Sequence, residues 1–95
     1  MTDDRAEPEP VRIPIGHELD LHTFHPHDVR SCVEEFIRSA AQTGLDCVRL
    51  VHGRGHGILR RTVHETLARH PSVVEYWDDP SSHLGATYAR LKPTP

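Results

Sequence analysis

In the stretch Cys47-Val48-Arg49-Leu50-Val51-His52-Gly53-Arg54-Gly55-His56-Gly57, an aliphatic run passes directly into a segment with three glycines. The β-branched and aliphatic residues of this run predict a strand over Cys47–His52. A helix is predicted over Ile58–Arg69, because apolar side chains recur on one helical face before Pro71. The stretch therefore forms the centre of a strand, glycine-rich turn and helix unit.

A second unit of the same kind precedes this one. Leu19 and Leu21 alternate with polar neighbours, which is the period of a short strand. Pro26 suits the first turn of a following helix, and Gly44 suits its C-terminal stop. Between them runs an apolar stripe with helical spacing, formed by Val29, Cys32, Val33, Phe36, Ile37, Ala40 and Ala41.

Two further strands are predicted after the second helix, over Val73–Trp77 and Gly85–Leu91, with a polar loop over Asp78–Leu84. The order is therefore βαβαββ, an α/β fold. Strands that alternate with helices predict parallel pairing through crossovers, and the terminal hairpin adds an antiparallel strand. We expect a two-layer sandwich with a mixed four-stranded sheet and two helices.

The N-terminal residues differ in composition from the rest of the chain. Residues 1–10 hold four acidic side chains and one arginine, which accounts for the whole formal charge of −3. We therefore predict a disordered, acidic, proline-rich tail over residues 1–12 and a nearly neutral domain over residues 13–95. Val11–Ile15 is expected to be an extended lead-in at the edge of the sheet. Arg54, Arg60 and Arg61 lie in one segment, and this local basic patch is compatible with binding a phosphate backbone.

The cellular compartment follows from what the sequence lacks. No apolar run approaches the roughly 20 residues that a membrane-spanning helix needs. The first residues do not resemble a secretory signal, so a cytoplasmic protein is expected. Cys32 and Cys47 lie inside hydrophobic patterns and are expected to be core thiols, not a disulfide.

Residues with useful chemistry follow the first two strands. The C-terminal ends of parallel strands gather at one edge of a sheet, so His22 and His52 are expected close together there. Asp20 lies two residues before His22 and shares its face of the strand. The Gly53–Gly57 loop opens a helix, where glycines allow close approach and backbone N–H groups favour an anion. Arg54 adds a cation that suits phosphate.

The remaining histidines and aromatics carry weaker predictions. His25 and His27 flank Pro26 and are either solvated or capping, and no Cys pair supports a zinc site. Tyr76 and Trp77 are expected in the core or on an exposed face of the sheet. The other histidines are expected to be ordinary surface residues: His17, His64, His70 and His83.

With these residues in place, the chain resembles the small MutS-related (Smr) domain over roughly residues 13 to 92. Leu19-Asp20-Leu21-His22 matches the family's Leu-Asp-Leu-His motif, and His52-Gly53-Arg54-Gly55 matches its His-Gly-Lys/Arg-Gly motif. Supporting matches are Gly57-Ile58-Leu59-Arg60, His70-Pro71 and Gly85-Ala86-Thr87. The first family motif usually continues with glycine, whereas Thr23 stands here, so either the turn differs or the position tolerates a side chain.

The resemblance implies a two-layer βαβαββ domain and an endonuclease that acts on RNA or DNA. It implies catalytic roles for Asp20, His22 and His52. Phosphate would be bound by Gly53, Arg54, Gly55, Gly57 and Thr23. The metal requirement stays open, with Mg²⁺ and Mn²⁺ as the candidates.

Two alternatives compete with the endonuclease. One is a non-catalytic module that binds nucleic acid or a ribosome-associated partner. The other is a metal-dependent hydrolase of small phosphate esters. The sequence does not separate RNA from DNA or assign an oligomeric state.

Overall fold

The strands of this computed structural model, which describes residues 17–55 and 57–92, form one mixed four-stranded sheet. Its spatial order is β1-β2-β4-β3. The strand bounds are β1 Glu18–Asp20, β2 Cys47–Val51, β3 Val73–Asp78 and β4 Ala86–Leu91. The predicted strands are confirmed to within two residues at each end. The predicted tail and lead-in and His56 lie outside the described residues.

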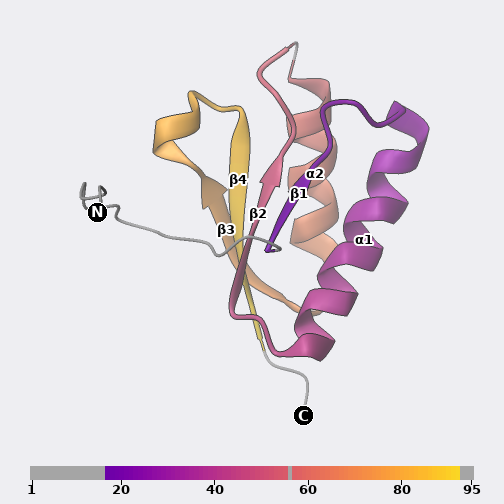
Figure 1. Ribbon diagram of the computed structural model, residues 1–95, viewed down its shortest axis with the longest axis vertical. Helices are drawn as coiled ribbons and strands as arrows, with labels where there is room; N and C mark the ends of the chain where they lie inside the picture. Colours follow the sequence, from indigo (N-terminus) through magenta and orange to yellow (C-terminus); the bar gives the residue numbers. More distant parts are fainter. Residues whose placement is uncertain (1–16, 56, 93–95) are drawn as a thin grey trace, which may run out of the picture.

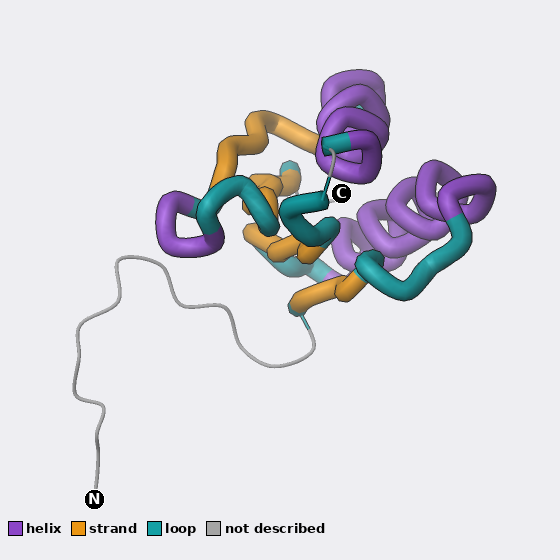
Figure 2. The backbone as a smooth tube through the Cα atoms, turned by 90° about the horizontal axis from the view of Figure 1, so that it is seen from above, coloured by secondary structure: helices purple, strands orange, loops and turns teal. Residues whose placement is uncertain are grey.

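Two helices, α1 (Pro26–Thr43) and α2 (Ile58–Arg69), cover one face of the sheet, as Figure 2 shows. The apolar stripe of α1 behaves as predicted, since Val29, Val33 and Ile37 are fully buried. They pack with Val63 and Leu67 of α2 and with the aliphatic side chains of the strands. The two-layer α/β sandwich is therefore confirmed. None of the described helices is long and apolar enough to span a bilayer.

Both ends of α1 have identifiable caps. The His25 ring accepts a hydrogen bond from the backbone N–H of His27 at 3.2 Å, so His25 is the N-cap. Gly44 ends the helix at φ 91°, a conformation that glycine adopts without a Cβ clash. Cys32 and Cys47 are free thiols, both half-buried.

The strand pairing differs from the prediction at one point. β1 and β2 are parallel as expected, but β2 does not pair with β3 because β4 lies between them, antiparallel to both. β4 is buried along almost its whole length, whereas β3 exposes Val74 and Glu75. The most buried strand takes one of the two inner positions, where both of its edges are paired.

This topology brings four chain segments to one edge of the sheet, at the top of Figure 1. β3 runs in the same direction as β1 and β2, since it is antiparallel to β4. The C-terminal ends of three strands therefore meet the start of β4. A short 3₁₀ helix, Pro80–Ser82, and the turn after it complete this edge.

Candidate functional site

The edge carries an exposed carboxylate and imidazole pair after β1. His22 Nδ1 lies 2.5 Å from Asp20 Oδ1, and the backbone N–H of His22 donates to the same oxygen at 3.1 Å. These hydrogen bonds lower the pKa of Asp20 below its usual value, so its carboxylate is ionised at neutral pH. Because Nδ1 is bound to Asp20, Nε2 is the ring nitrogen left to exchange a proton with a substrate. The His22 side chain is 58% exposed.

The glycine-rich loop lies directly beside this pair. A Cβ placed on Gly53 would lie 3.6 Å from the Cβ of His22, so Gly53 lies directly beside the His22 side chain. Gly53 and Gly57 have φ of 84° and 83°, which only glycine adopts readily. A cavity of about 210 Å³ is lined by His52, Gly53, Gly55, Gly57, Ile58 and Leu59. The predicted approach of the two motifs is therefore present in the structure.

Gly85 ties the start of β4 to this loop. Its carbonyl accepts from the backbone N–H groups of His52 at 3.0 Å and Gly53 at 2.9 Å. A Cβ on Gly85 would lie 3.2 Å from Cγ of Arg54 and 3.0 Å from the Ser82 carbonyl. Because Gly85 has no side chain, the aliphatic part of the Arg54 side chain can pack against its backbone. Arg54 is nevertheless exposed to solvent.

His52 has an environment opposite to that of His22, since only 3% of it is exposed. Nδ1 of His52 lies 3.1 Å from the carbonyl oxygen of Gly53. A carbonyl oxygen can only accept a hydrogen bond, so Nδ1 carries the proton and donates it. Nε2 then accepts from the Thr87 hydroxyl at 2.9 Å. Burial lowers the pKa of His52, which keeps the ring neutral at pH 7. His52 thus joins the glycine loop to β4.

The chain of hydrogen bonds continues into α2 through His64. Its Nε2 lies 2.9 Å from the Thr87 hydroxyl oxygen, which accepts because its proton goes to His52. Its ring contacts Tyr76 at a centroid distance of 4.9 Å. Burial, followed by the nearby charge of Arg60, lowers the pKa of His64.

The prediction of an ordinary surface residue is therefore wrong for His64. A signal was present in the sequence. Arg60, Val63, His64 and Leu67 share the i, i+3, i+4, i+7 spacing of one helical face, so His64 lies on the face that contains buried Val63 and Leu67.

The predicted basic patch is smaller than the sequence suggested. Arg60 makes a bidentate ion pair with Asp78 at the end of β3, with N···O distances of 2.9 and 2.7 Å. This contact lowers the pKa of Asp78. Arg61 faces Glu65 one helical turn away. Arg54 makes no ion pair within residues 17–55 and 57–92, and it is the cation that this edge offers an anion.

Thr23 is exposed in the turn after His22 and does not have a positive φ. The described non-glycine residues with a positive φ are His83 and Leu84. The turn therefore does not require glycine at position 23, and a side chain is accommodated.

Metal ligands are sparse at this edge. Within the described part of the chain, no group of three or more His, Cys, Asp or Glu side chains could hold a metal ion. Magnesium and manganese favour several oxygen ligands, and the site presents the carboxylate of Asp20 with one oxygen engaged by His22. The residues therefore do not form a protein cage for either ion.

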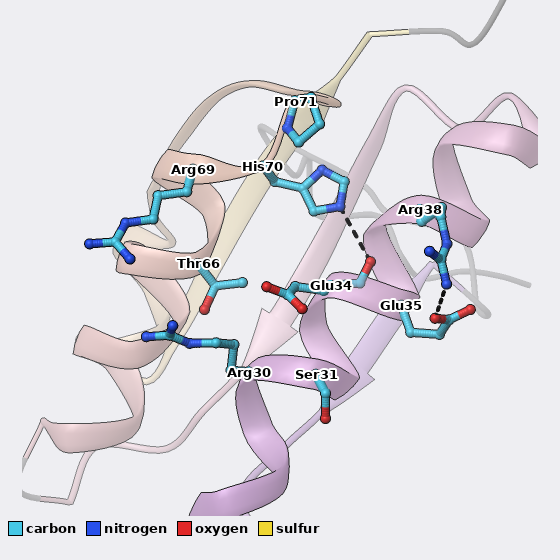
Figure 3. Close-up of a pocket in the computed structure, with 9 residues that line it drawn as sticks. All are labelled: Arg30, Ser31, Glu34, Glu35, Arg38, Thr66, Arg69, His70 and Pro71. Carbon is cyan, nitrogen blue, oxygen red and sulfur yellow. Dashed lines mark hydrogen bonds and ion pairs between the residues drawn. The ribbon is translucent and has the colours of Figure 1, made fainter.

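Another cavity, of about 420 Å³, lies between α1 and α2, away from the motifs (Figure 3). The carboxylate of Glu34 points into it, while Arg38 pairs with Glu35 on the outer side of α1. His70 closes one end, with Nε2 3.3 Å from the Glu34 carbonyl, so this half-buried histidine also differs from the surface residue predicted. None of the residues of the two motifs lines this cavity, and the candidate site remains at the strand edge.

Known proteins share the sequence pattern and the fold of this chain. The sequence profile of the Smr domain matches residues 19–92. The chain belongs to the Smr domain family. It is 35% identical to Endonuclease MutS2 of Brevibacillus brevis over 80 residues, which are 82% of this chain and 10% of that protein. It is 32% identical to Endonuclease MutS2 of Helicobacter pylori, strain 26695, over 93% of this chain and 12% of that protein.

Two solved structures share the fold of this Smr domain. The Smr domain of Thermus thermophilus MutS2 superposes with a TM-score of 0.76 at 32% identity, covering 80% of this chain and 98% of that one. YdaL, a stand-alone small MutS-related protein from Escherichia coli, also gives 0.76 at 29% identity, over 83% and 66% of the two chains. The chain spans about a tenth of the length of the MutS2 relatives it matches.

Proposed function

We propose that this Smr domain is an endonuclease that cleaves phosphodiester bonds in RNA or in branched or flexible DNA. The observation that carries the proposal is the exposed Asp20 and His22 pair in contact with the Gly53 loop. An acid–base group, an orienting carboxylate and a glycine-rich anion site then lie at the same edge. The names of the MutS2 relatives are consistent with a nucleic-acid substrate.

In this proposal His22 moves the proton. The lone pair of Nε2 accepts a proton from the attacking oxygen, which is a water or, in RNA, the adjacent 2′-hydroxyl. The imidazolium returns a proton to the oxygen of the leaving strand as the P–O bond breaks. Asp20 orients the ring through Nδ1 and stabilises its positive charge, because the carboxylate is held ionised.

The phosphate is held by the neighbouring loop. Backbone N–H groups of Gly55 and Gly57 at the start of α2, together with Arg54, bind the phosphate oxygens. The N–H of Gly53 is donated to the Gly85 carbonyl, so Gly53 shapes the turn and, contrary to the expectation from the sequence, does not bind phosphate. The exposed hydroxyl of Thr23 adds a further donor. His52 has a positioning role in this proposal. Its buried ring is hydrogen-bonded to the Gly53 carbonyl and to the Thr87 hydroxyl, and these two bonds hold the loop in place.

The test is cleavage of end-labelled RNA and DNA by the purified protein, as single strands, duplexes and branched molecules. Each substrate is incubated with Mg²⁺, with Mn²⁺ and with a chelator. Asp20→Ala and His22→Ala are each expected to lower the rate at least about 100-fold, the usual contribution of a positioned acid–base group. Glu18→Ala is the matched control, since Glu18 is a carboxylate on the same face of β1 that faces Arg49 at 3.3 Å.

The outcomes separate the endonuclease from its rivals. Unchanged cleavage by folded Asp20→Ala and His22→Ala would show that the mechanism is wrong. Nucleic-acid binding that survives Asp20→Ala, with no cleavage by the wild type under any ionic condition, would favour a binding module for nucleic acid or a ribosome-associated partner. Hydrolysis of a small phosphodiester without cleavage of any polynucleotide would favour a small-ester hydrolase.

A further inference from the structure

An exposed apolar side chain lies at the tip of the turn between β3 and β4. Leu84 is 54% exposed and has a φ of 71°, and the preceding residue, His83, has a φ of 54°. Two successive non-glycine residues in the left-handed region are uncommon, because Cβ crowds the backbone there. Glycine at either position would remove this strain. The fold therefore keeps leucine at a position that its backbone conformation does not favour.

The turn that carries Leu84 is rigidly braced. The Ser82 hydroxyl donates to the Asp79 carbonyl at 2.7 Å and accepts from the backbone N–H groups of Gly85 and Ala86 at 3.1 and 3.0 Å. The Asp79 carboxylate accepts from the Ser81 N–H at 2.9 Å and from Arg49 at 3.0 Å. Such a network holds a strained tip in one place, and strained residues of this kind concentrate at binding and active sites.

The tip adjoins the proposed phosphate loop. Leu84 directly precedes Gly85, whose carbonyl binds the N–H groups of His52 and Gly53 and whose Cα faces the Arg54 side chain. Ile58, 65% exposed, opens α2 at the other end of the same loop. Among the described residues the three most exposed large hydrophobic side chains are Ile58, Val74 and Leu84, so two of them belong to this edge.

We propose that Leu84 packs against the face of a nucleobase next to the phosphate that Arg54 and the glycine loop hold. This inference rests on the proposed function and names a residue that selects its substrate. The face of a base is apolar, and nucleic-acid-binding proteins use aliphatic side chains against such faces. In a continuous duplex both faces are covered by neighbouring bases. Leu84 therefore favours an unstacked nucleotide, as in a single strand, a flap or a junction.

Leu84→Gly separates this role from a structural one. Removing the Cβ relieves the left-handed strain, so the melting temperature is expected to stay the same or to rise. Loss of the base contact is expected to weaken binding of a fluorescent single-stranded oligonucleotide about fivefold, which is the lower end of the range for one base stacked on an aromatic side chain. Binding of a continuous duplex is expected to change less than about twofold, because phosphate contacts dominate there.

The binding experiment is carried out in the His22→Ala background, so that cleavage does not consume the oligonucleotide. Val74→Ala is the matched control, because Val74 is 47% exposed on β3 and is not part of this edge. Leu84→Asn is a second variant that tolerates the left-handed conformation while replacing the apolar surface. Leu84→Met is expected to retain most of the single-strand affinity.

The binding measurements distinguish failure of the proposed base contact from failure of the proposed function. If folded Leu84→Gly and Leu84→Asn bind the single strand as tightly as the parent, the base contact is refuted while the endonuclease proposal stands. An equal loss of single-strand and duplex binding would also overturn it, since Leu84 would then not select unstacked bases. If the parent binds no nucleic acid, the proposed function fails, and this inference fails with it.

Discussion

His22 and His52 occupy neighbouring strand ends, belong to the two motifs of the domain and have opposite environments. The side chain of His22 is 58% exposed and pairs with Asp20, whereas His52 is 3% exposed and binds Thr87. β1 is an edge strand, while β2 is paired on both sides, with β1 and with β4. The same residue type is therefore exposed and paired with a carboxylate in one place, and buried with both ring nitrogens hydrogen-bonded in the other; in the proposed mechanism only the exposed one moves a proton.

This difference shows what a motif alone does not reveal. Both histidines are expected at one edge of the sheet from their positions after parallel strands, and both are present there. Which ring nitrogen can reach a substrate depends on the neighbours that cover it. For His52 those neighbours are a carbonyl and a threonine hydroxyl, which occupy both nitrogens.

Substituting each histidine by glutamine is expected to give the largest effect, on the cleavage rate for His22 and on the free energy of unfolding for His52. His22→Gln should lower cleavage at least about 100-fold, because glutamine cannot carry a proton. Its free energy of unfolding should change by no more than about 0.5 kcal/mol, as is usual for an exposed position. His52→Gln should lower the free energy of unfolding by about 1–3 kcal/mol, because buried partners lose their hydrogen bonds.

Urea unfolding followed by Trp77 fluorescence and a cleavage assay on the same samples measure both quantities. The roles assigned to the two histidines would be wrong if His52→Gln kept its free energy of unfolding and lost all cleavage. His52 would then be the proton carrier in place of His22.

A change of pH is expected to have a smaller effect on the free energy of unfolding. Burial lowers the pKa of His52 and His64 in the folded state below the ordinary value of 6.5. Below about pH 6.5 the unfolded chain therefore binds protons that the folded chain does not, and the free energy of unfolding falls until the folded pKa values are passed. Above that pH this contribution to stability is fully present. Urea unfolding at a series of pH values from about 8 to about 5 measures the slope of this free energy against pH.

His64→Gln provides the control for this slope. It removes one of the two buried imidazoles, so its stability should depend less steeply on pH than that of the wild type. A slope equal to that of the wild type would mean that His64 does not contribute. A wild type that is equally stable across this range would contradict the burial of both rings.

The smallest effect is expected from Thr23→Gly, which restores the residue usual in the first family motif. Thr23 does not have a positive φ and is exposed, so glycine is not needed for the turn. Cleavage should change less than about fivefold, because one exposed hydroxyl donor contributes on the order of 0.5–1 kcal/mol. A large gain in the cleavage rate would show that the threonine side chain obstructs the substrate. A large loss would assign its hydroxyl a stronger phosphate contact than proposed.

Local features were the most predictable from sequence. The stripe of α1 and its stop at Gly44 depend on residues three or four positions apart and on one glycine at φ 91°, so the pattern contains the information. The same holds for the strand that ends at the Gly53 loop. Features that depend on distant residues were missed. His64 meets Thr87 across 23 positions, and Arg60 meets Asp78 across 18.

The sequence by itself therefore determined the elements, their order and the family, because helical and strand periods and the two motifs are written in neighbouring residues. Only the tertiary structure decided that β4 separates β2 from β3, since position in a sheet depends on which strand can be buried at both edges. It also decided that Arg60 is neutralised by Asp78 and that His52 is turned inward. Pairing and burial of charged and polar groups follow from long-range packing, which no local pattern contains.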